Sequence, residues 1–472
     1  MGTEIDETRF DRDDFLRFSQ RLRDETRLYK DWLSEGRFVD GPRRMGLELE
    51  AWLVDEAGRP APCNAQVLES LHDPLLSPEL AQYNLELNTH PLALRDTALS
   101  DTQRQLEALW ARVAAAAAPL GVRPGMIGIL PSVTEDDLCL ARMSKLRRYQ
   151  ALNEQVLLLR NREPLSVDIR GEERVQTRHA DLMLESAATS LQLHLQVGPA
   201  EAPAFYNAAA ALSAATVALA ANAPFLFGRS LWEETRIPLF EQAVAVGPLH
   251  GGHAGPLSRV GFGSGYARDG LYSFFVENRQ HYPVLLPVPL GEPAERLPHL
   301  RLHNGTIWRW NRPLVGFEED GRPHLRIEHR VMSAGPSFID TLANAAFFYG
   351  AVHALAAGDR KLPYPVLEAN FYAAARHGLR ATIHWGGGEI SVQRLILTQL
   401  LPAAAQQLQA LGLAQTDIDR YLGVIEARVS AERTGAAWQR QWVGRHGRDF
   451  AGLTRAYLKQ QAGGEPVHAW PI

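Results

Sequence analysis

The stretch GLELEAWLVD, residues 46–55, places two glutamates in a segment that otherwise has the composition of a buried β-strand. Successive side chains on a strand point to opposite faces, so Glu48 and Glu50 lie on the same face, about 7 Å apart. Two like charges on one face of an apolar strand are costly unless a positive charge lies between them. The stretch therefore predicts a strand of a sheet whose polar face holds a cation.

Four further segments alternate polar and apolar residues in the same way, which predicts strands of the same antiparallel sheet. One interpretation is a sheet with one solvated face, which antiparallel sheets commonly have. A solvated face usually carries Lys, Thr and Ser, whereas these segments carry metal ligands and phosphate donors, so we favour a sheet that forms the floor of a site. The polar positions are Asn84, Glu86 and Asn88 in YNLELNT, Gln192, His194 and Gln196 in LQLHLQV, His299, Arg301 and His303 in HLRLH, and Arg326, Glu328 and Arg330 in LRIEHRV.

The acidic residues of this face predict a magnesium site. Hard cations take carboxylate oxygens, and Mg²⁺ commonly bridges the phosphates of a nucleotide. Arginine can pair with two phosphate oxygens at once, so Arg301 and Arg330 are candidate phosphate ligands. The predicted metal ligands are Glu48, Glu50, Glu86, Glu328 and His194.

The remaining pattern is mostly helical. Residues 247–270 are rich in glycine and contain His250 and His253. We favour a mobile lid or a surface loop there over a zinc site, which needs further ligands. Without a repeat or a low-complexity linker, the simplest account is one α+β domain over residues 1–472. Helical spacing predicts helices over residues 8–36, 97–118, 202–222 and 337–357, and a helical tail over 391–465.

The composition excludes several classes of protein. The net charge of −5 gives no reason to expect a nucleic-acid partner. Cys63 and Cys139 lack CxxC spacing, which argues against a disulfide scaffold or a structural zinc site and favours buried cysteines. The charged N-terminus lacks an apolar signal core, and the apolar stretch 208–227 contains Asn and Pro. We therefore expect a cytoplasmic protein with no membrane partner. The chain contains no P-loop, HExxH or GxSxG motif.

Six motifs in order resemble those of the glutamate–cysteine ligase family, in particular its bacterial and plant-type branch of carboxylate–amine ligases. Ser144 departs from this pattern, since it stands where the family usually has proline, and Trp308 and Trp310 form an unusual pair before the last motif. The residues of the cysteine pocket cannot be matched. The motifs are GLELE (46–50), NLELNTHP (84–91), RMSKLRRY (142–149), SLQLHLQV (190–197), ANAPFLFGR with EETR (221–236) and RIEHR (326–330).

The resemblance implies the fold of glutamine synthetase, a curved antiparallel sheet with helices on its outer side and the active site on its concave face. It also implies roles for residues that the strand pattern leaves open. Arg330 and Arg312 would stabilise the transferred phosphoryl group, and Arg236 would hold the substrate carboxylate. A surface salt bridge with Glu233 or Glu234 is the alternative for Arg236. The other substrate-binding residues implied are Asn88, Thr89, Arg148, Tyr149 and Gln192.

The chemistry implied is ATP-dependent amide formation. The γ-phosphoryl group of ATP moves to a carboxylate, an amine attacks the acyl phosphate, and two or three Mg²⁺ ions neutralise the phosphates. Glutamate and cysteine are the substrates that the resemblance favours. A ligase for another acid or amine, and a non-catalytic protein that binds nucleotides or amino acids, remain alternatives. The clustered carboxylates argue against the non-catalytic protein. The oligomeric state stays open, with a homodimer among the states allowed.

Overall fold

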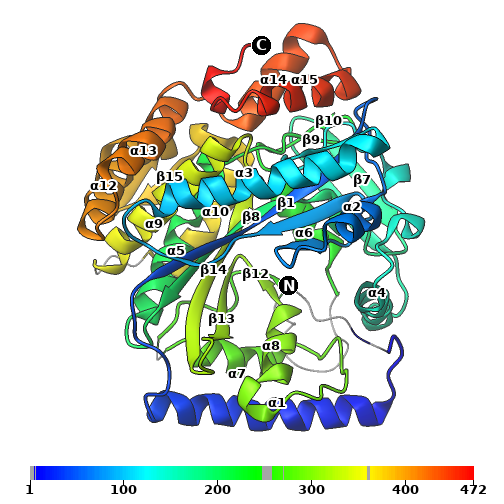
Figure 1. Ribbon diagram of the computed structural model, residues 1–472, viewed down its shortest axis with the longest axis vertical. Coiled ribbons are helices and arrows are strands. Elements are labelled where there is room, and N and C mark those ends of the chain that lie inside the picture. Colours follow the sequence, from blue (N-terminus) through cyan, green and yellow to red (C-terminus); the bar gives the residue numbers. More distant parts are fainter. Residues whose placement is uncertain (1–4, 6, 247–257, 269, 359–361) are drawn as a thin grey trace.

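A computed structural model describes residues 5, 7–246, 258–268, 270–358 and 362–472 (Figure 1). The predictions for His250 and His253 lie outside the described residues. The predictions for the other segments can be compared with the elements described below.

Among the described residues, eight strands form one antiparallel sheet in the order β13-β14-β8-β1-β3-β2, with β4 and β5 paired to β1. Its strands are β1 (Arg44–Asp55), β2 (Leu76–Pro78), β3 (Asn84–Asn88), β4 (Leu92–Ala93), β5 (Val122–Gly125), β8 (Ser190–Val197), β13 (Asn311–Phe317) and β14 (Pro323–Ser333). Short two-stranded pairs are β6 (Leu165–Arg170) with β7 (Arg174–His179), β9 (Phe225–Leu226) with β10 (Arg229–Ser230), β11 (Val260–Gly261) with β12 (Trp308–Arg309), and β15 (Thr382–Trp385) with β16 (Gly388–Ser391).

The register of the sheet brings the predicted polar positions to one face. Glu48 lies opposite Asn88 on one side and Gln192 on the other. Glu50 lies opposite Glu86, and His194 lies opposite Glu328. Directly opposed residues of antiparallel strands point to the same face, so these side chains share one surface. Four of the five segments predicted as strands are therefore confirmed.

The described residues also form helices, among which α5 and α9 pack against the apolar face of the sheet (Figure 1). They are α1 (Arg12–Ser34), α2 (Asn64–Leu71), α3 (Ala98–Ala117), α4 (Arg147–Leu159), α5 (Ala202–Leu219), α6 (Arg236–Ala243), α7 (Tyr272–His281), α8 (Pro298–Gly305), α9 (Phe338–Ala356), α10 (Tyr364–His377), α11 (Val392–Leu395), α12 (Leu401–Ala410), α13 (Gln415–Ser430), α14 (Gly435–His446) and α15 (Phe450–Ala462). The helices predicted from periodicity are confirmed, although α11 and α12 are joined by a π-helical turn at Ile396–Leu400.

The core lies between the sheet and α5 and α9. Leu49, Leu193 and Ile327, on the apolar face of three neighbouring strands, are fully buried. The hydroxyl of Tyr349 on α9 donates to the backbone oxygens of Gly46 and His194, at 3.0 and 3.1 Å, and so ties β1 to β8. Helix α5 is long and apolar enough to cross a membrane by length and composition alone, but 78% of it is buried inside the protein, as expected of a core helix.

The prediction of a strand at HLRLH was wrong, because residues 298–305 form helix α8. The residues buried there are His299, Leu300, His303 and Asn304, a spacing of one helical turn. Five residues with alternating polarity are too few to separate a strand from such a turn. Arg301 therefore does not belong to the sheet but to a helix on its polar side.

Candidate active site

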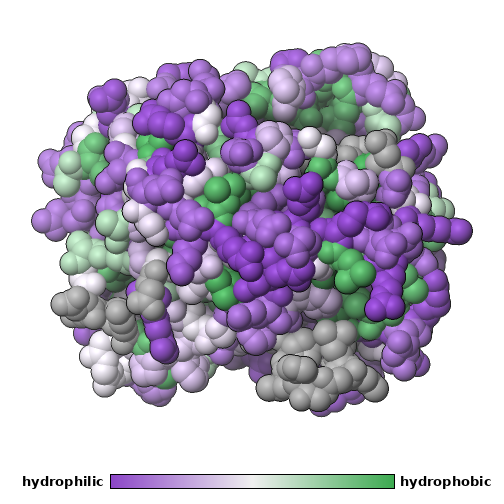
Figure 2. All heavy atoms as spheres, turned by 90° about the horizontal axis from the view of Figure 1, so that it is seen from below, coloured by the Kyte–Doolittle hydropathy of each residue, from purple (hydrophilic) through white to green (hydrophobic). Residues whose placement is uncertain are grey.

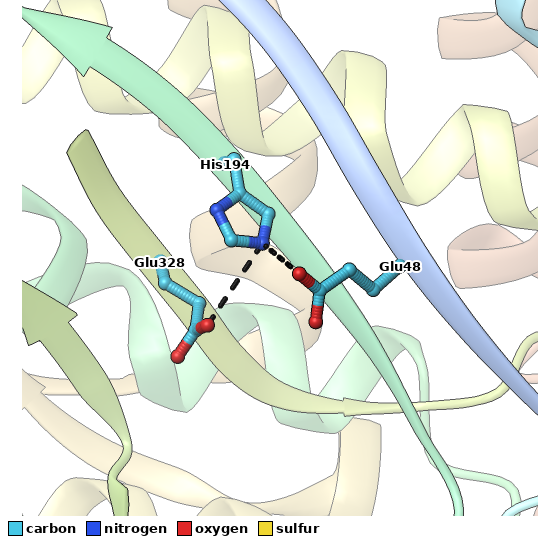
Figure 3. Close-up of side chains that lie close together, drawn as sticks. All are labelled: Glu48, His194 and Glu328. Carbon is cyan, nitrogen blue, oxygen red and sulfur yellow. Dashed lines mark ion pairs between the residues drawn. The ribbon is translucent and has the colours of Figure 1, made fainter. Parts of the chain in front are cut away.

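Three neighbouring strands bring Glu48, His194 and Glu328 together on the polar face (Figure 3). The Nε2 atom of His194 lies 3.1 Å from Oε1 of Glu48 and 3.8 Å from Oε1 of Glu328. One ligand atom from each residue lies within 4.8 Å of the other two. Both ring nitrogens of His194 are buried without a hydrogen-bond partner. An orphaned imidazole nitrogen beside two carboxylates is a donor set that fits a divalent cation.

The Glu48 and Glu328 carboxylates are held ionised. Burial raises the pKa of Glu328, but Arg312 and Arg330 outweigh it and lower the pKa to about 2. Burial also opposes ionisation of Glu48, whereas the charge of the neighbouring His194 brings the pKa of Glu48 well below its usual range. Both residues are therefore ready to act as ligands at neutral pH.

In a second group of carboxylates, no neighbouring positive charge outweighs the effect of burial on the pKa. Burial and the charges of Glu48 and Glu50 raise the pKa of Glu86 to about 8. Burial and the charge of Glu50 raise the pKa of Glu185 to about 8 as well. Burial, with Glu86 next, raises the pKa of Glu79 well above its usual range. These acids are short of positive charge, so the group fits one or more cations that would hold them ionised.

Sequence reasoning missed Glu79 and Glu185, which line the same cavity as Glu50 and Glu86. Glu79 follows the short strand β2, and Glu185 begins a single 3₁₀ turn at Glu185–Ala187. Neither position belongs to an alternating strand, so no periodic signal could have marked it. Only the arrangement of the chain in space brings these two carboxylates to the polar face.

Two arginines border the carboxylates. Arg312 donates from Nε and Nη2 to the two oxygens of Glu328, at 2.8 and 2.9 Å. Arg330 donates from Nη1 to Oε2 of Glu328 at 3.1 Å and to Oε1 of Gln192 at 2.5 Å. Gln192 in turn donates to Glu50 at 3.0 Å. The predicted phosphate-facing arginines are thus joined to the predicted metal ligands in one network.

Arg236 opens helix α6 and is buried, with 3% of its surface exposed. Its Nε atom has no hydrogen-bond partner and lies 3.6 Å from Oε1 of Glu234, which is also buried. Its Nη2 atom donates to the backbone oxygen of Val331 at 2.5 Å. The alternative of a surface salt bridge is therefore excluded, although Glu234 is its ionic neighbour. Arg236 borders a small cavity together with Glu50, Glu185, Arg330 and Trp310.

The other predicted substrate residues fall into two groups. Arg148 and Tyr149 line the cavity of the acidic residues, and the Tyr149 hydroxyl donates to the backbone oxygen of Pro78 at 3.1 Å. Asn88 is on the polar face but donates to Glu86 at 3.0 Å. The Thr89 hydroxyl accepts from the backbone N–H of Leu47 at 3.0 Å. Neither Asn88 nor Thr89 is among the described residues that line the two cavities at the polar face.

The site consists of two adjoining chambers. The acidic chamber has a volume of about 220 Å³, and its charged lining includes Glu50, Glu79, Glu86, Glu185 and Arg148. The arginine chamber has a volume of about 210 Å³, and its charged lining includes Arg301, Arg326, His194 and Glu328. The wall that they share consists of Glu48, Leu302, Gly305 and Arg312.

Two solved structures share this fold. A glutamate–cysteine ligase from Francisella tularensis in complex with AMP has a TM-score of 0.53 and 12% sequence identity, and the match covers 90% of this chain and 89% of that one. A bifunctional glutathione synthetase from Pasteurella multocida has a TM-score of 0.55 and 13% identity over 95% of this chain, which spans only 55% of that protein. No curated protein sequence matches the chain. The predicted glutamine synthetase-like fold is confirmed.

With this fold, the chain is an ATP-dependent ligase by the family that its sequence matches. The sequence model of the glutamate-cysteine ligase family 2 matches residues 44–464. The chain belongs to this family, which confirms the resemblance seen in its motifs. The match begins at the first residue of β1 and leaves α1 outside.

Proposed function

We propose that the protein is an ATP- and Mg²⁺-dependent ligase that joins the γ-carboxylate of glutamate to the amino group of cysteine through an acyl phosphate. The observation that carries this proposal is the cluster of Glu48, His194 and Glu328 at the junction of the two chambers, beside Arg312 and Arg330. Phosphoryl transfer needs alignment and charge neutralisation more than a protein nucleophile, and this cluster offers both.

The carboxylates would hold the metal ions in two groups. Glu48, His194 and Glu328 are the ligands of one ion, and Glu50 and Glu86 belong to the second group. Bound Mg²⁺ supplies charge neutralisation at the phosphates. The paired arginines keep Glu328 ionised, and Ser190 and Gln192 donate hydrogen bonds to Glu50. The protein thus fixes its ligands before a cation arrives.

We assign the nucleotide to the arginine chamber and both other substrates to the acidic chamber. Arg301 and Arg326 give the arginine chamber the positive charge that phosphates require. Arg330 and Arg312, next to the shared wall, would stabilise the transferred phosphoryl group. Arg236 would hold a substrate carboxylate, since its buried Nε atom has no hydrogen-bond partner and Arg236 lines a small cavity beside Glu50 and Arg330.

The amine is the least constrained part of the proposal. Part of the acidic chamber is lined by apolar groups, among them Leu80, Leu152, Leu182 and Leu286, with Trp308 beside them. Such a wall suits the uncharged side chain of cysteine, and it also suits an amine with a larger apolar group. A ligase of the same chemistry for such an amine is therefore the second candidate.

ADP release with ATP, Mg²⁺, glutamate and a panel of amines tests the proposal. The panel contains cysteine, small amino acids and apolar amines, and reactions without acid or without amine serve as controls. We expect the highest ADP release with cysteine and the appearance of γ-glutamylcysteine by mass spectrometry. ADP only with another amine would select the second candidate, and no ADP with any amine would reject both. The substrates are small molecules of the cytoplasm, where we expect the enzyme to act.

A further inference from the structure

Helix α1 precedes the family-matched region 44–464, yet it packs directly under the arginine chamber. In Figure 1 it lies along the lower edge of the molecule, below α7 and α8. Tyr29, fully buried, lies 5.0 Å from the ring of Phe275 on α7, and Phe275 lines the chamber. Phe18 lies 5.0 Å, edge to face, from the ring of His299 on α8. The face seen from below is mostly hydrophilic (Figure 2), and the buried residues of α1 include Phe18, Leu22, Tyr29 and Trp32.

A buried acid joins α1 to α8. Glu25, in the middle of α1, is only 1% exposed. One carboxylate oxygen lies 2.6 Å from Nδ1 of His299, and the other accepts the backbone N–H of Leu300 at 2.8 Å. A buried carboxylate is costly unless its oxygens are hydrogen-bonded, and both oxygens of Glu25 are. Because the first N–H groups of a helix lack partners within the helix, Glu25 acts as the cap of α8.

Helix α8 forms part of the wall of both chambers. Its residues Arg301, Leu302 and Gly305 line the arginine chamber, and Leu302 and Gly305 also line the acidic chamber. At its C-terminal end, the Gly305 oxygen accepts from Arg312 at 3.2 Å, and Asn304 donates to the oxygen of Pro313 at 2.9 Å. Thus β13 holds one end of α8 and α1 holds the other.

We infer that Glu25 is a positioning residue of the nucleotide site, and that α1 belongs to this site although it lies outside the family-matched region. Glu25 fixes the N-terminal end of α8 and thereby the place of Arg301 in the arginine chamber. Ile5, which also precedes the matched region, is buried and lines the same chamber. The inference rests on the proposed function in one respect, namely that the arginine chamber holds the nucleotide.

The test compares Glu25→Ala, which removes both contacts, with Glu25→Gln, which keeps an oxygen for one of them. Asp24→Ala is the matched control, because Asp24 is 48% exposed on the same helix and pairs only with groups of α1. For Glu25→Ala we expect the KM for ATP to rise about tenfold or more, because a small misplacement of a binding group is costly. The KM for glutamate of Glu25→Ala should stay within about twofold of the wild-type value. The KM for ATP of Glu25→Gln should lie between the values of the wild type and Glu25→Ala, and that of Asp24→Ala should match the wild type.

Hydrogen–deuterium exchange supplies a readout that does not depend on turnover. Glu25→Ala should speed exchange in the peptide that contains residues 298–305, while peptides from β1 and β8 keep their wild-type rates. Unchanged exchange in α8 would overturn the inference. So would faster exchange without a change in the KM for ATP, or an equal rise in the KM for ATP and for glutamate. If the wild type releases no ADP, the proposed function fails, and the exchange experiment still decides whether Glu25 positions α8.

Discussion

In the proposed function Glu48 carries most of the chemistry, since it belongs to the proposed cation site and to the wall shared by the two chambers. Glu48→Gln keeps the size of the side chain and removes its charge. We expect Mg²⁺-dependent ADP release to fall by about 100-fold or more, because one ligand and its charge are lost. Steady-state assays with a Mg²⁺ titration measure the effect, and circular dichroism controls for the fold. Wild-type activity in this variant would contradict the metal assignment.

We expect Arg236 to contribute to the binding of the acid substrate and not to the binding of ATP. Arg236→Ala is expected to raise the KM for the acid about 10- to 100-fold, since a charge-assisted hydrogen bond is lost, and to leave the KM for ATP nearly unchanged. Arg236→Lys keeps the charge without the planar guanidinium group, so its KM for the acid should lie between those of the wild type and Arg236→Ala. Equal increases in both KM values would show that Arg236 does not bind the acid.

Alternation along strands predicts part of the candidate site, and the family motifs add Arg148, Tyr149 and Arg236, which also line its cavities. Glu48, Glu86, His194 and Glu328 were found because alternation along β1, β3, β8 and β14 leaves a periodic trace. Glu79 leaves no such trace, because it lies outside any long strand and reaches the cavity only through the tertiary fold. Burial of Arg236 was equally invisible, since nothing in the sequence separates a buried arginine beside a glutamate from an exposed one.

At the level of elements, the long helices could be predicted from their apolar spacing, whereas the short helix α8 could not. The helices α1, α3, α5 and α9 each run for 18 residues or more, long enough for their apolar spacing to be read. Helix α8 has eight residues and was taken for a strand. Its two ends make hydrogen bonds to Glu25 and Arg312, which are distant from it in sequence and leave no periodic pattern within the helix.

A buried ion pair joins α13 to α9. Asp340 on α9 lies 2.7 Å from Nη2 of Arg428 on α13, and the side chains are 0% and 1% exposed. The other oxygen of Asp340 accepts the N–H of Val467 at 2.9 Å. Asp340→Ala leaves Arg428 buried without its partner, and we expect the free energy of unfolding to fall by about 3–5 kcal/mol.

Urea denaturation measures this loss. The double variant Asp340→Ala/Arg428→Met should recover part of the stability, since the unpaired charge is gone. Asp320→Ala breaks the exposed pair with Arg322 and should leave the midpoint unchanged. A double variant as unstable as Asp340→Ala alone would mean that lost packing, rather than the unpaired charge, causes the effect.

For the whole molecule, the uncompensated acids predict how stability depends on pH. Glu86 and Glu185 have pKa values of about 8 in the folded protein, above the usual value for a carboxyl group. Between about pH 5 and pH 8 these two carboxyl groups therefore hold more protons in the folded state than in the unfolded state, so their contribution to the stability of the metal-free protein falls as the pH rises. Excess Mg²⁺ binds the ionised carboxylates and should reverse this fall.

Thermal unfolding from pH 5.5 to 8.5, with EDTA or with Mg²⁺, checks this prediction. The Tm with EDTA should decrease above about pH 7, where the buried histidines, whose pKa values burial lowers, are neutral in the folded and the unfolded state. The gain in Tm from Mg²⁺ should be largest at the alkaline end. In Glu86→Gln the decrease with EDTA should be smaller, because one titrating group is gone. A gain from Mg²⁺ that is largest at acidic pH would contradict the assignment of these carboxylates as cation ligands.

The wall of Glu48, Leu302, Gly305 and Arg312 between the two chambers has a consequence for the order of events. If the nucleotide occupies one chamber and the amine the other, neither has to depart before the other can enter. The kinetic mechanism should then be sequential, with ATP, acid and amine bound in one complex before any product leaves. Initial-velocity plots of ATP against the amine should give intersecting lines, whereas parallel lines would indicate a double-displacement mechanism that this wall does not require.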